Sequence, residues 1–136
     1  MRILAIDFGD KRIGLAVSDR LGITAQALGG YTVKNKKEDR HFFQELVRLH
    51  EISEIVIGLP LRMDGTEGER VQKTKVFAEW LSQAVDKPIV YWDERLTTRE
   101  ALRVLNQRKA NHKDKKRYKD QISATIILSA YLESKR

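Results

Sequence analysis

The chain of 136 residues contains no cysteine, and no long run of apolar residues interrupts it. Without cysteine it can form no disulfide bond, no thiolate zinc site and no cysteine nucleophile. No segment approaches the ~20 apolar residues of a transmembrane helix, and Met1 leads directly into a strand pattern without the regions that define a signal peptide. We therefore expect a soluble protein that stays in the cytoplasm.

Histidine is also scarce, and the three histidines show no metal-ligand spacing such as His-Glu-x-x-His. Any metal ion must therefore be bound by oxygen atoms. The length of the chain fits one domain over residues 1–136 with a single modest core, because domains cluster near ~100 to 150 residues.

The net charge of +7 comes from one segment. Residues 99–119 hold nine cations and two anions, whereas the other residues carry equal numbers of each sign. A charge run is often only a solvated face, but a local excess favours contact with a polyanion, and we predict nucleic acid as the partner. The cations of this run that we expect to bind its backbone are Arg108, Lys109, Lys113, Lys115, Lys116, Arg117 and Lys119.

The periodicity of apolar residues predicts an α/β protein with a mixed five-stranded sheet. The expected strands cover residues 2–8, 13–19, 26–33, 54–60 and 88–94. The expected helices lie around 42–50, 71–85, 97–105 and 120–133. Thr66 with Glu69, and Thr97 with Glu100, have capping-box spacing before the second and third helices. Three antiparallel strands followed by β-α-β crossovers give a sheet that is flanked by helices.

Acidic residues stand where ligands bind in such sheets, outside the carboxyl ends of strands. Asp7 ends the most apolar strand, and Asp93 and Glu94 end the last strand on opposite faces, because strand side chains alternate. One of this pair should face the same cleft as Asp7. Asp120 begins the last helix, and its spacing to Ala124 places it on the apolar face that docks.

Each of these acids also has a purely structural explanation, as a turn residue before Gly9, as an ion-pair partner of Arg95, or as a favourable charge at a helix N-terminus. Three carboxylates in one partly desolvated cleft repel one another, however, unless a cation or a proton compensates. Mg²⁺ or Mn²⁺, which prefer carboxylate oxygen, would supply that compensation.

Four segments in order resemble the YqgF family, also called RuvX, of bacterial proteins: IDFGDKRIGLAVSD, IGLPLRMDGTEGER, DERLTT and KDQISATIILSAYL. The resemblance covers essentially the whole chain. It implies an RNase H-like fold related to the RuvC Holliday junction resolvases, and a nuclease that matures the 5′ end of pre-16S rRNA in ribosome biogenesis. Family members are also described as Holliday junction resolvases that act in DNA recombination and repair.

The same resemblance implies that the acidic site consists of Asp7, Glu94 and Asp120. RuvC-type enzymes carry a second acid on the last helix, where this chain has Ser123, so we expect either weaker metal occupancy or a second ion that depends on substrate. Our hypothesis is a metal-dependent endonuclease in which Asp7 bridges two ions about 4 Å apart and the other two acids each complete one side. The ions would activate a water and stabilise the leaving 3′ oxygen.

Four further cations have predicted roles near this site. Lys11 and Arg12 would neutralise a phosphate, unless they are ordinary charges of a hairpin turn. Arg70 would contact the backbone beside a helix N-terminus, which favours anions, and Arg95 would do the same or position Glu94. Tyr91 and Trp92 belong to a strand, and we expect both in the core.

Several alternatives stay open at this point. The sequence does not separate pre-rRNA from branched DNA, because both offer the same phosphodiester, nor a monomer from a weak homodimer. A non-catalytic RNA-binding module would explain the charge but not the three acids. An actin-like ATPase would share the opening IDFG segment, but 136 residues leave no room for its second domain.

Overall fold

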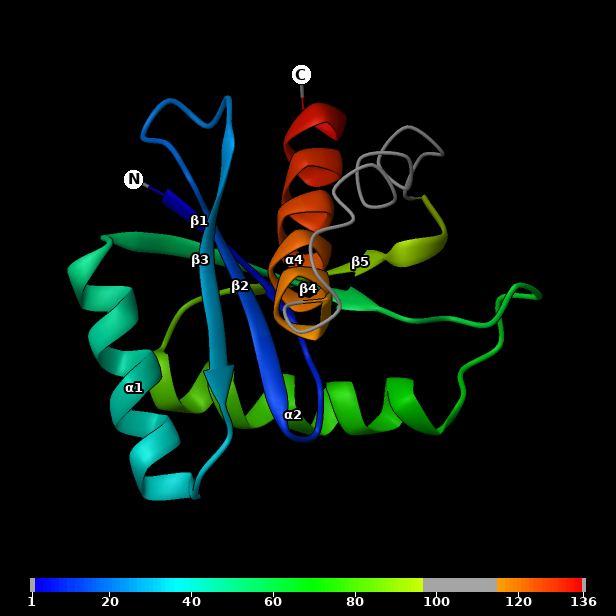
Figure 1. The fold of residues 1–136 in the computed structure, drawn as a ribbon, viewed down its shortest axis with the longest axis horizontal. Coiled ribbons are helices and arrows are strands. Elements are labelled where there is room, and N and C mark those ends of the chain that lie inside the picture. The colour runs from blue at the N-terminus through cyan, green and yellow to red at the C-terminus, as the bar shows by residue number, and fades with distance from the viewer. Residues whose placement is uncertain (1, 97–114, 136) are drawn as a thin grey trace.

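The computed structural model describes residues 2–96 and 115–135, with side chains from residue 122 onward in the second range. Five strands form one mixed sheet in the order β3-β2-β1-β4-β5 (Figure 1). The first three strands pair antiparallel, and β4 and β5 run parallel to β1. Their bounds are β1 Arg2–Asp7, β2 Arg12–Ser18, β3 Ala25–Thr32, β4 Ile52–Leu59 and β5 Ile89–Asp93.

Helices cover both faces of this sheet. Helices α1 (Lys36–Leu49) and α2 (Glu69–Val85) pack on one face, and α4 (Lys115–Ser134) packs on the other (Figure 1). A short 3₁₀ helix, η1 (Glu94–Leu96), follows β5. None of the helices in the described residues is long and apolar enough to cross a membrane.

Strand β1 shows how one strand serves two cores. Leu4 and Ile6 pack against α1 and α2, whereas Ala5 packs against α4, and all three are fully buried. The α4 side has small side chains, because Ala16 on β2 and Ala124 on α4 are fully buried there as well. These small residues let α4 lie close to the sheet, where it packs on β1, β2 and β4.

The predicted strands agree with the observed ones to within two residues at each end, and the mixed sheet is confirmed. The last helix starts at Lys115 instead of Asp120, because its basic first turns contain helix-forming Lys and Arg and no Gly or Pro. The capping box predicted for α2 is wrong: the N-cap is Gly68, and the Thr66 hydroxyl donates to Asp64. The helix predicted around 97–105 lies outside the described residues.

Candidate active site

Asp7 occupies the carboxyl end of the central strand. It pairs with Gly14 of β2, and it follows Ile6, whose partner on β4 is Ile57, so it lies level with Gly58. Because side chains alternate along a strand, Asp7 shares the α4 face with Ala5. The side chain is half-buried, at the junction between the sheet core and solvent.

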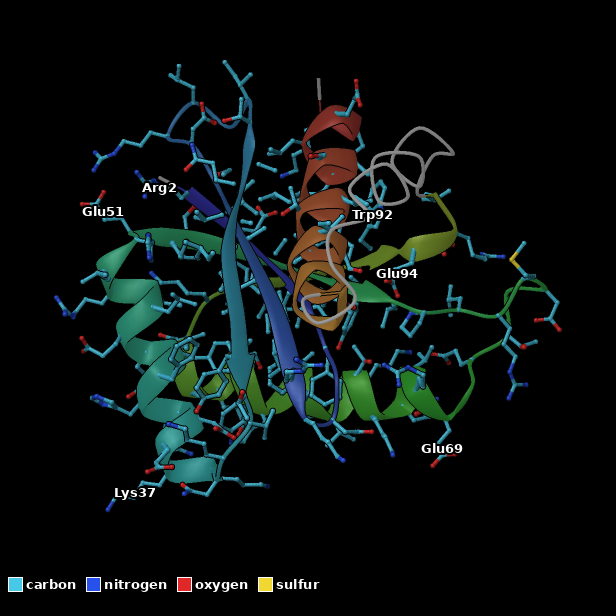
Figure 2. All side chains as sticks on the ribbon, in the orientation of Figure 1. Arg2, Lys37, Glu51, Glu69, Trp92 and Glu94 are labelled. Atoms are coloured by element: carbon cyan, nitrogen blue, oxygen red, sulfur yellow. The ribbon has the colours of Figure 1, made fainter. Side chains whose placement is uncertain are left out.

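Glu94 follows β5 directly and lies over Gly58 of the neighbouring strand (Figure 2). A Cβ atom built on Gly58 would lie 3.0 Å from Glu94 Cγ and 3.1 Å from Cδ, and 2.6 Å from Ile127 Cδ1 of α4. The absence of a side chain at this position therefore creates the space for the Glu94 carboxyl group. Since Asp7 is level with Gly58 on the same face, the sheet brings the two predicted acids to one place.

Burial raises the pKa of Glu94 above its usual value, and the negative charge of Asp93 adds to this effect. The positive charge of Arg70 acts in the opposite direction. Arg70 lies in the first turn of α2, and its Nη2 donates to the carbonyl oxygen of Phe8, 3.4 Å away. The structure therefore brings Arg70 between the turn after Asp7 and the Glu94 carboxylate, with its side chain exposed.

Asp93 faces away from this site, as the alternation along β5 predicts. The Arg95 side chain donates to both of its carboxylate oxygens, from Nε at 3.1 Å to each oxygen and from Nη2 at 2.7 Å. This pairing lowers the pKa of Asp93 and raises that of Arg95. The ion pair predicted as a structural alternative is therefore formed by Asp93, and Glu94 is the member that faces the side of Asp7.

Lys11 and Arg12 lie in the hairpin between β1 and β2, at the same end of the sheet as Asp7. Lys11 is exposed, and Arg12 is half-buried at the start of β2. The turn is tight, because a Cβ atom on Gly9 would lie 2.4 Å from the carbonyl oxygen of Arg12. Both readings of these cations, as phosphate contacts and as charges of a hairpin turn, are compatible with this position.

The remaining predicted site residues fall outside what the structure describes. Asp120 lies on α4, one turn before Ala124, but its side chain is outside the described residues, as are those of Lys115, Lys116, Arg117 and Lys119. Arg108, Lys109 and Lys113 also lie outside the described residues. Among the side chains that are described, no three His, Cys, Asp or Glu residues form a group that could hold a metal ion.

The chemistry of the described donors nevertheless fits a hard divalent cation. Asp7 and Glu94 offer only carboxylate oxygen, and burial raises the pKa of Glu94, so the charged form of this acid needs a compensating cation. Helix α4 packs on the sheet face that Asp7 shares with Ala5. The sequence predicts the third carboxylate, that of Asp120, on the side of this helix that docks on the sheet.

Sequence reasoning missed Gly58, although the apolar run IVIGL offered a signal, since a glycine inside a buried strand often marks a close approach. The core assignment of Trp92 is confirmed, because it is half-buried and its ring packs edge-to-face on that of Tyr131, with 6.0 Å between the ring centroids. The same assignment is wrong for Tyr91, which is 41% exposed because β5 is an edge strand.

Comparison with known proteins identifies relatives along almost the whole chain. A family model described as "RuvX: Holliday junction resolvase" matches residues 1–134. A relative from Halothermothrix orenii is 43% identical over 132 residues, 97% of this chain and 94% of the relative, and is named "Putative pre-16S rRNA nuclease". A relative with the same name from Koribacter versatilis is 47% identical, over 97% of this chain and 86% of its own length.

Solved structures confirm the expected fold. Thermus thermophilus RuvC aligns with a TM-score of 0.60 and 12% identity, over 99% of this chain and 97% of that one. The resolvase of fowlpox virus, solved with Holliday junction DNA, aligns with a TM-score of 0.52 and 14% identity, over 98% of both chains. At this identity the similarity shows the RNase H-like fold that the sequence predicted.

Proposed function

We propose, since the chain belongs to the RuvX family, that this protein is a nuclease that hydrolyses phosphodiester bonds at the 5′ end of pre-16S rRNA. The observation that carries the proposal is the placement of Asp7 and Glu94 on either side of Gly58, at the carboxyl ends of the parallel strands β1 and β5 that flank β4. Its relatives named for the same substrate support this choice. Processing of a ribosomal precursor would take place in the cytoplasm.

Asp7, Glu94 and Asp120 would hold Mg²⁺ or Mn²⁺. Bound divalent ions would supply a nucleophilic water at neutral pH and stabilise charge on the phosphate and the leaving oxygen. The chain prepares this site in two ways: β1 fixes Asp7 at its end, and the absence of a side chain at Gly58 leaves Glu94 a partly buried position. Arg70, beside both acids, would orient a phosphate that enters the site.

Lys11, Arg12 and the cations of residues 108–119 would bind the phosphate backbone beyond the cleaved bond. Neutralising four of these lysines, Lys113, Lys115, Lys116 and Lys119, should reduce the slope of log affinity against log salt concentration by about 3 to 4, because each phosphate contact releases roughly 0.7 to 0.9 of a counterion. An unchanged slope would show that these lysines contact no phosphate and form only a solvated face. Arg95 would act mainly through Asp93, to which it is bound.

The test is cleavage of two labelled substrates, an RNA that spans the 5′ end of pre-16S rRNA and a synthetic four-way DNA junction, with Mg²⁺ or Mn²⁺. Asp7→Asn, Glu94→Gln and Asp120→Asn should each abolish cleavage while binding and folding, followed by fluorescence anisotropy and circular dichroism, are retained. Full activity of any purified variant would remove that residue from the site. Tight binding without cleavage under every metal condition would favour a non-catalytic RNA-binding module.

A second candidate is cleavage of Holliday junctions, which the family description and the fold of the solved resolvases favour. A resolvase must make two symmetric cuts, so this function would require a dimer on the junction. Paired cuts in the DNA junction, together with a dimer in sedimentation analysis, would support the resolvase, whereas cutting of the RNA by a monomer would support the processing nuclease.

A further inference from the structure

The loop Pro60–Gly68, called the 60–68 loop below, starts at the carboxyl end of β4, between the strands that carry Asp7 and Glu94. Figure 1 shows it in green as a projection beyond the edge of the sheet, before α2 begins. Met63 lies in this projection and is 91% exposed, more than any other large hydrophobic side chain in the described part of the chain. An isolated exposed apolar residue is common, so its meaning depends on how it is held.

The 60–68 loop holds Met63 in a hydrogen-bonded turn. The amide of Gly65 donates to the carbonyl oxygen of Arg62 at 2.8 Å, and the amide of Arg62 donates to that of Thr66 at 3.1 Å. Thr66 in turn donates to the Asp64 carboxylate from its amide at 2.9 Å and its hydroxyl at 2.6 Å. Because the turn is already ordered, placing Met63 against a partner costs little further backbone entropy.

Two guanidinium groups brace the turn. Arg95 Nη1 lies 3.5 Å from the carbonyl oxygen of Met63, to which it donates, and a Cβ atom on Gly65 would lie 3.3 Å from the same nitrogen. Arg62 folds over the other end of the loop, where a Cβ atom on Gly68 would lie 3.1 Å from its Nε. Two arginines therefore brace the backbone of the turn that carries Met63, and Arg95, which is bound to Asp93, connects this turn to β5 beside Glu94.

An exposed apolar tip on an ordered turn suits a nucleic acid, because its stacked bases offer an apolar gap. Proteins that kink nucleic acid insert apolar wedges, Met among them, between adjacent bases, and arginine contacts the phosphates nearby. The flexible thioether of Met adapts to the irregular gap between two bases. A protein partner would also bury Met63, but the position of the 60–68 loop, between the strands that carry Asp7 and Glu94, favours the substrate of the proposed nuclease.

We propose that Met63 is a wedge that inserts between two stacked bases next to the bond that is cut. This inference rests on the proposed nuclease function and adds a substrate contact to the same site. Separating the two bases would turn the intervening phosphate out of the regular backbone, towards the end of the sheet where Asp7 and Glu94 lie. Arg62 would bind a phosphate beside the opened step, while Arg95, bound to Asp93, would hold the turn in place.

The first measurement uses the RNA and the four-way DNA junction, each with 2-aminopurine beside the mapped cleavage position, and the cleavage-deficient Asp7→Asn protein. Binding should raise the 2-aminopurine fluorescence, because unstacking relieves its quenching. The double variant with Asp7→Asn and Met63→Ala should lose most of that rise. The control is Leu21→Ala in the same background, since Leu21 is 80% exposed on the β2–β3 hairpin at the other end of the sheet. It should leave the signal unchanged.

The second measurement is cleavage by the enzyme with Asp7 intact. Met63→Ala should reduce kcat/KM about ten- to a hundredfold, the factor that corresponds to the lost burial of one Met side chain. An abasic site at the opened step should restore most of this loss, because no base then needs to be unstacked, whereas a merely structural role of Met63 would not respond to the abasic site. Leu21→Ala should cleave at the wild-type rate.

These outcomes separate the two proposals. Cleavage with unchanged fluorescence, or a Met63→Ala enzyme that cuts an intact substrate as fast as the wild type, would overturn the wedge and leave the nuclease in place. Absence of cleavage of both substrates by the wild-type enzyme would overturn the nuclease and the wedge together.

Discussion

Gly58→Ala tests whether the space above this glycine is needed for both the fold and the Glu94 carboxyl group. The added Cβ would meet Ile127 Cδ1 at 2.6 Å, a distance at which one group has to move, and Glu94 Cγ and Cδ at 3.0 and 3.1 Å. Overpacking of this kind costs about 1 to 3 kcal/mol. Alanine gains roughly 0.5 to 1 kcal/mol over glycine in a strand through lower chain entropy, so we expect a net loss of up to about 2.5 kcal/mol.

The assay is urea unfolding, followed by tryptophan fluorescence, with Gly30→Ala as the matched control. Gly30 lies in β3 of the same sheet, and a Cβ there would meet only the carbonyl oxygen of Ile13 at 3.6 Å, an ordinary contact. Gly30→Ala should therefore be neutral or slightly stabilising. Equal effects of the two substitutions would refute the packing argument.

A double-mutant cycle with Ile127→Val isolates the clash, because this change removes the Cδ1 atom that the new methyl group meets. Alone, Ile127→Val should cost about 0.5 to 1.5 kcal/mol. In the Gly58→Ala background it should cost less or become stabilising, with a coupling energy of about 0.5 kcal/mol or more. Additive effects on the free energy of unfolding would show that the Ile127 side chain can move away from the new methyl group without loss of stability. Cleavage should stay low in the double variant, since the displacement of Glu94 is not repaired.

Three other substitutions test parts of the same structure. Glu94→Gln, in metal-free protein, should unfold at a higher urea concentration than wild type at pH 7 and at a similar one below pH 4. The reason is that burial raises the pKa of Glu94 in the folded state, so the wild type loses stability as the pH rises through it; a lower midpoint at pH 7 would contradict this. Arg95→Ala should accelerate tryptic cleavage after Arg62, because the 60–68 loop loses the donor to Met63; an unchanged rate would show that the turn holds itself. Tyr31→Phe removes the hydroxyl that donates to the buried Asp39 carboxylate at 2.5 Å and should cost about 1 to 3 kcal/mol at neutral pH. The pKa of Tyr31 is raised to about 12, so this difference should shrink between pH 10 and 12, and a constant difference would argue against the bond.

Much of the fold could be predicted from the sequence, because a strong apolar pattern determines which face of a strand or helix is buried. The continuous apolar runs around Leu4 and Val56 predicted buried strands, and both have zero exposure. The helical stripe through Ile127 and Tyr131 predicted a docked last helix, which covers one face of the sheet. The predicted start of this helix was wrong, because charge says nothing about backbone conformation when the residues are good helix formers.

The candidate site shows the same division. The sequence determined which acids stand at strand ends, because an aspartate or glutamate that follows an apolar run can be recognised from the order of residues alone. It also determined that Asp93 and Glu94 point to opposite faces, since that follows from the pleat alone. The strand pattern did not determine which of the two meets Asp7, because that depends on which helices cover which face; only the family resemblance implied Glu94.

Only the tertiary structure decided the contacts between residues far apart in the chain. It placed Glu94 over Gly58, Arg70 against the turn after Asp7, and Arg95 against the 60–68 loop. Such contacts depend on strand order, register and the close approach of α4, and no local pattern encodes them. A glycine in an apolar run marks a possible close approach, but only the packed sheet shows that a carboxyl group occupies the space it leaves.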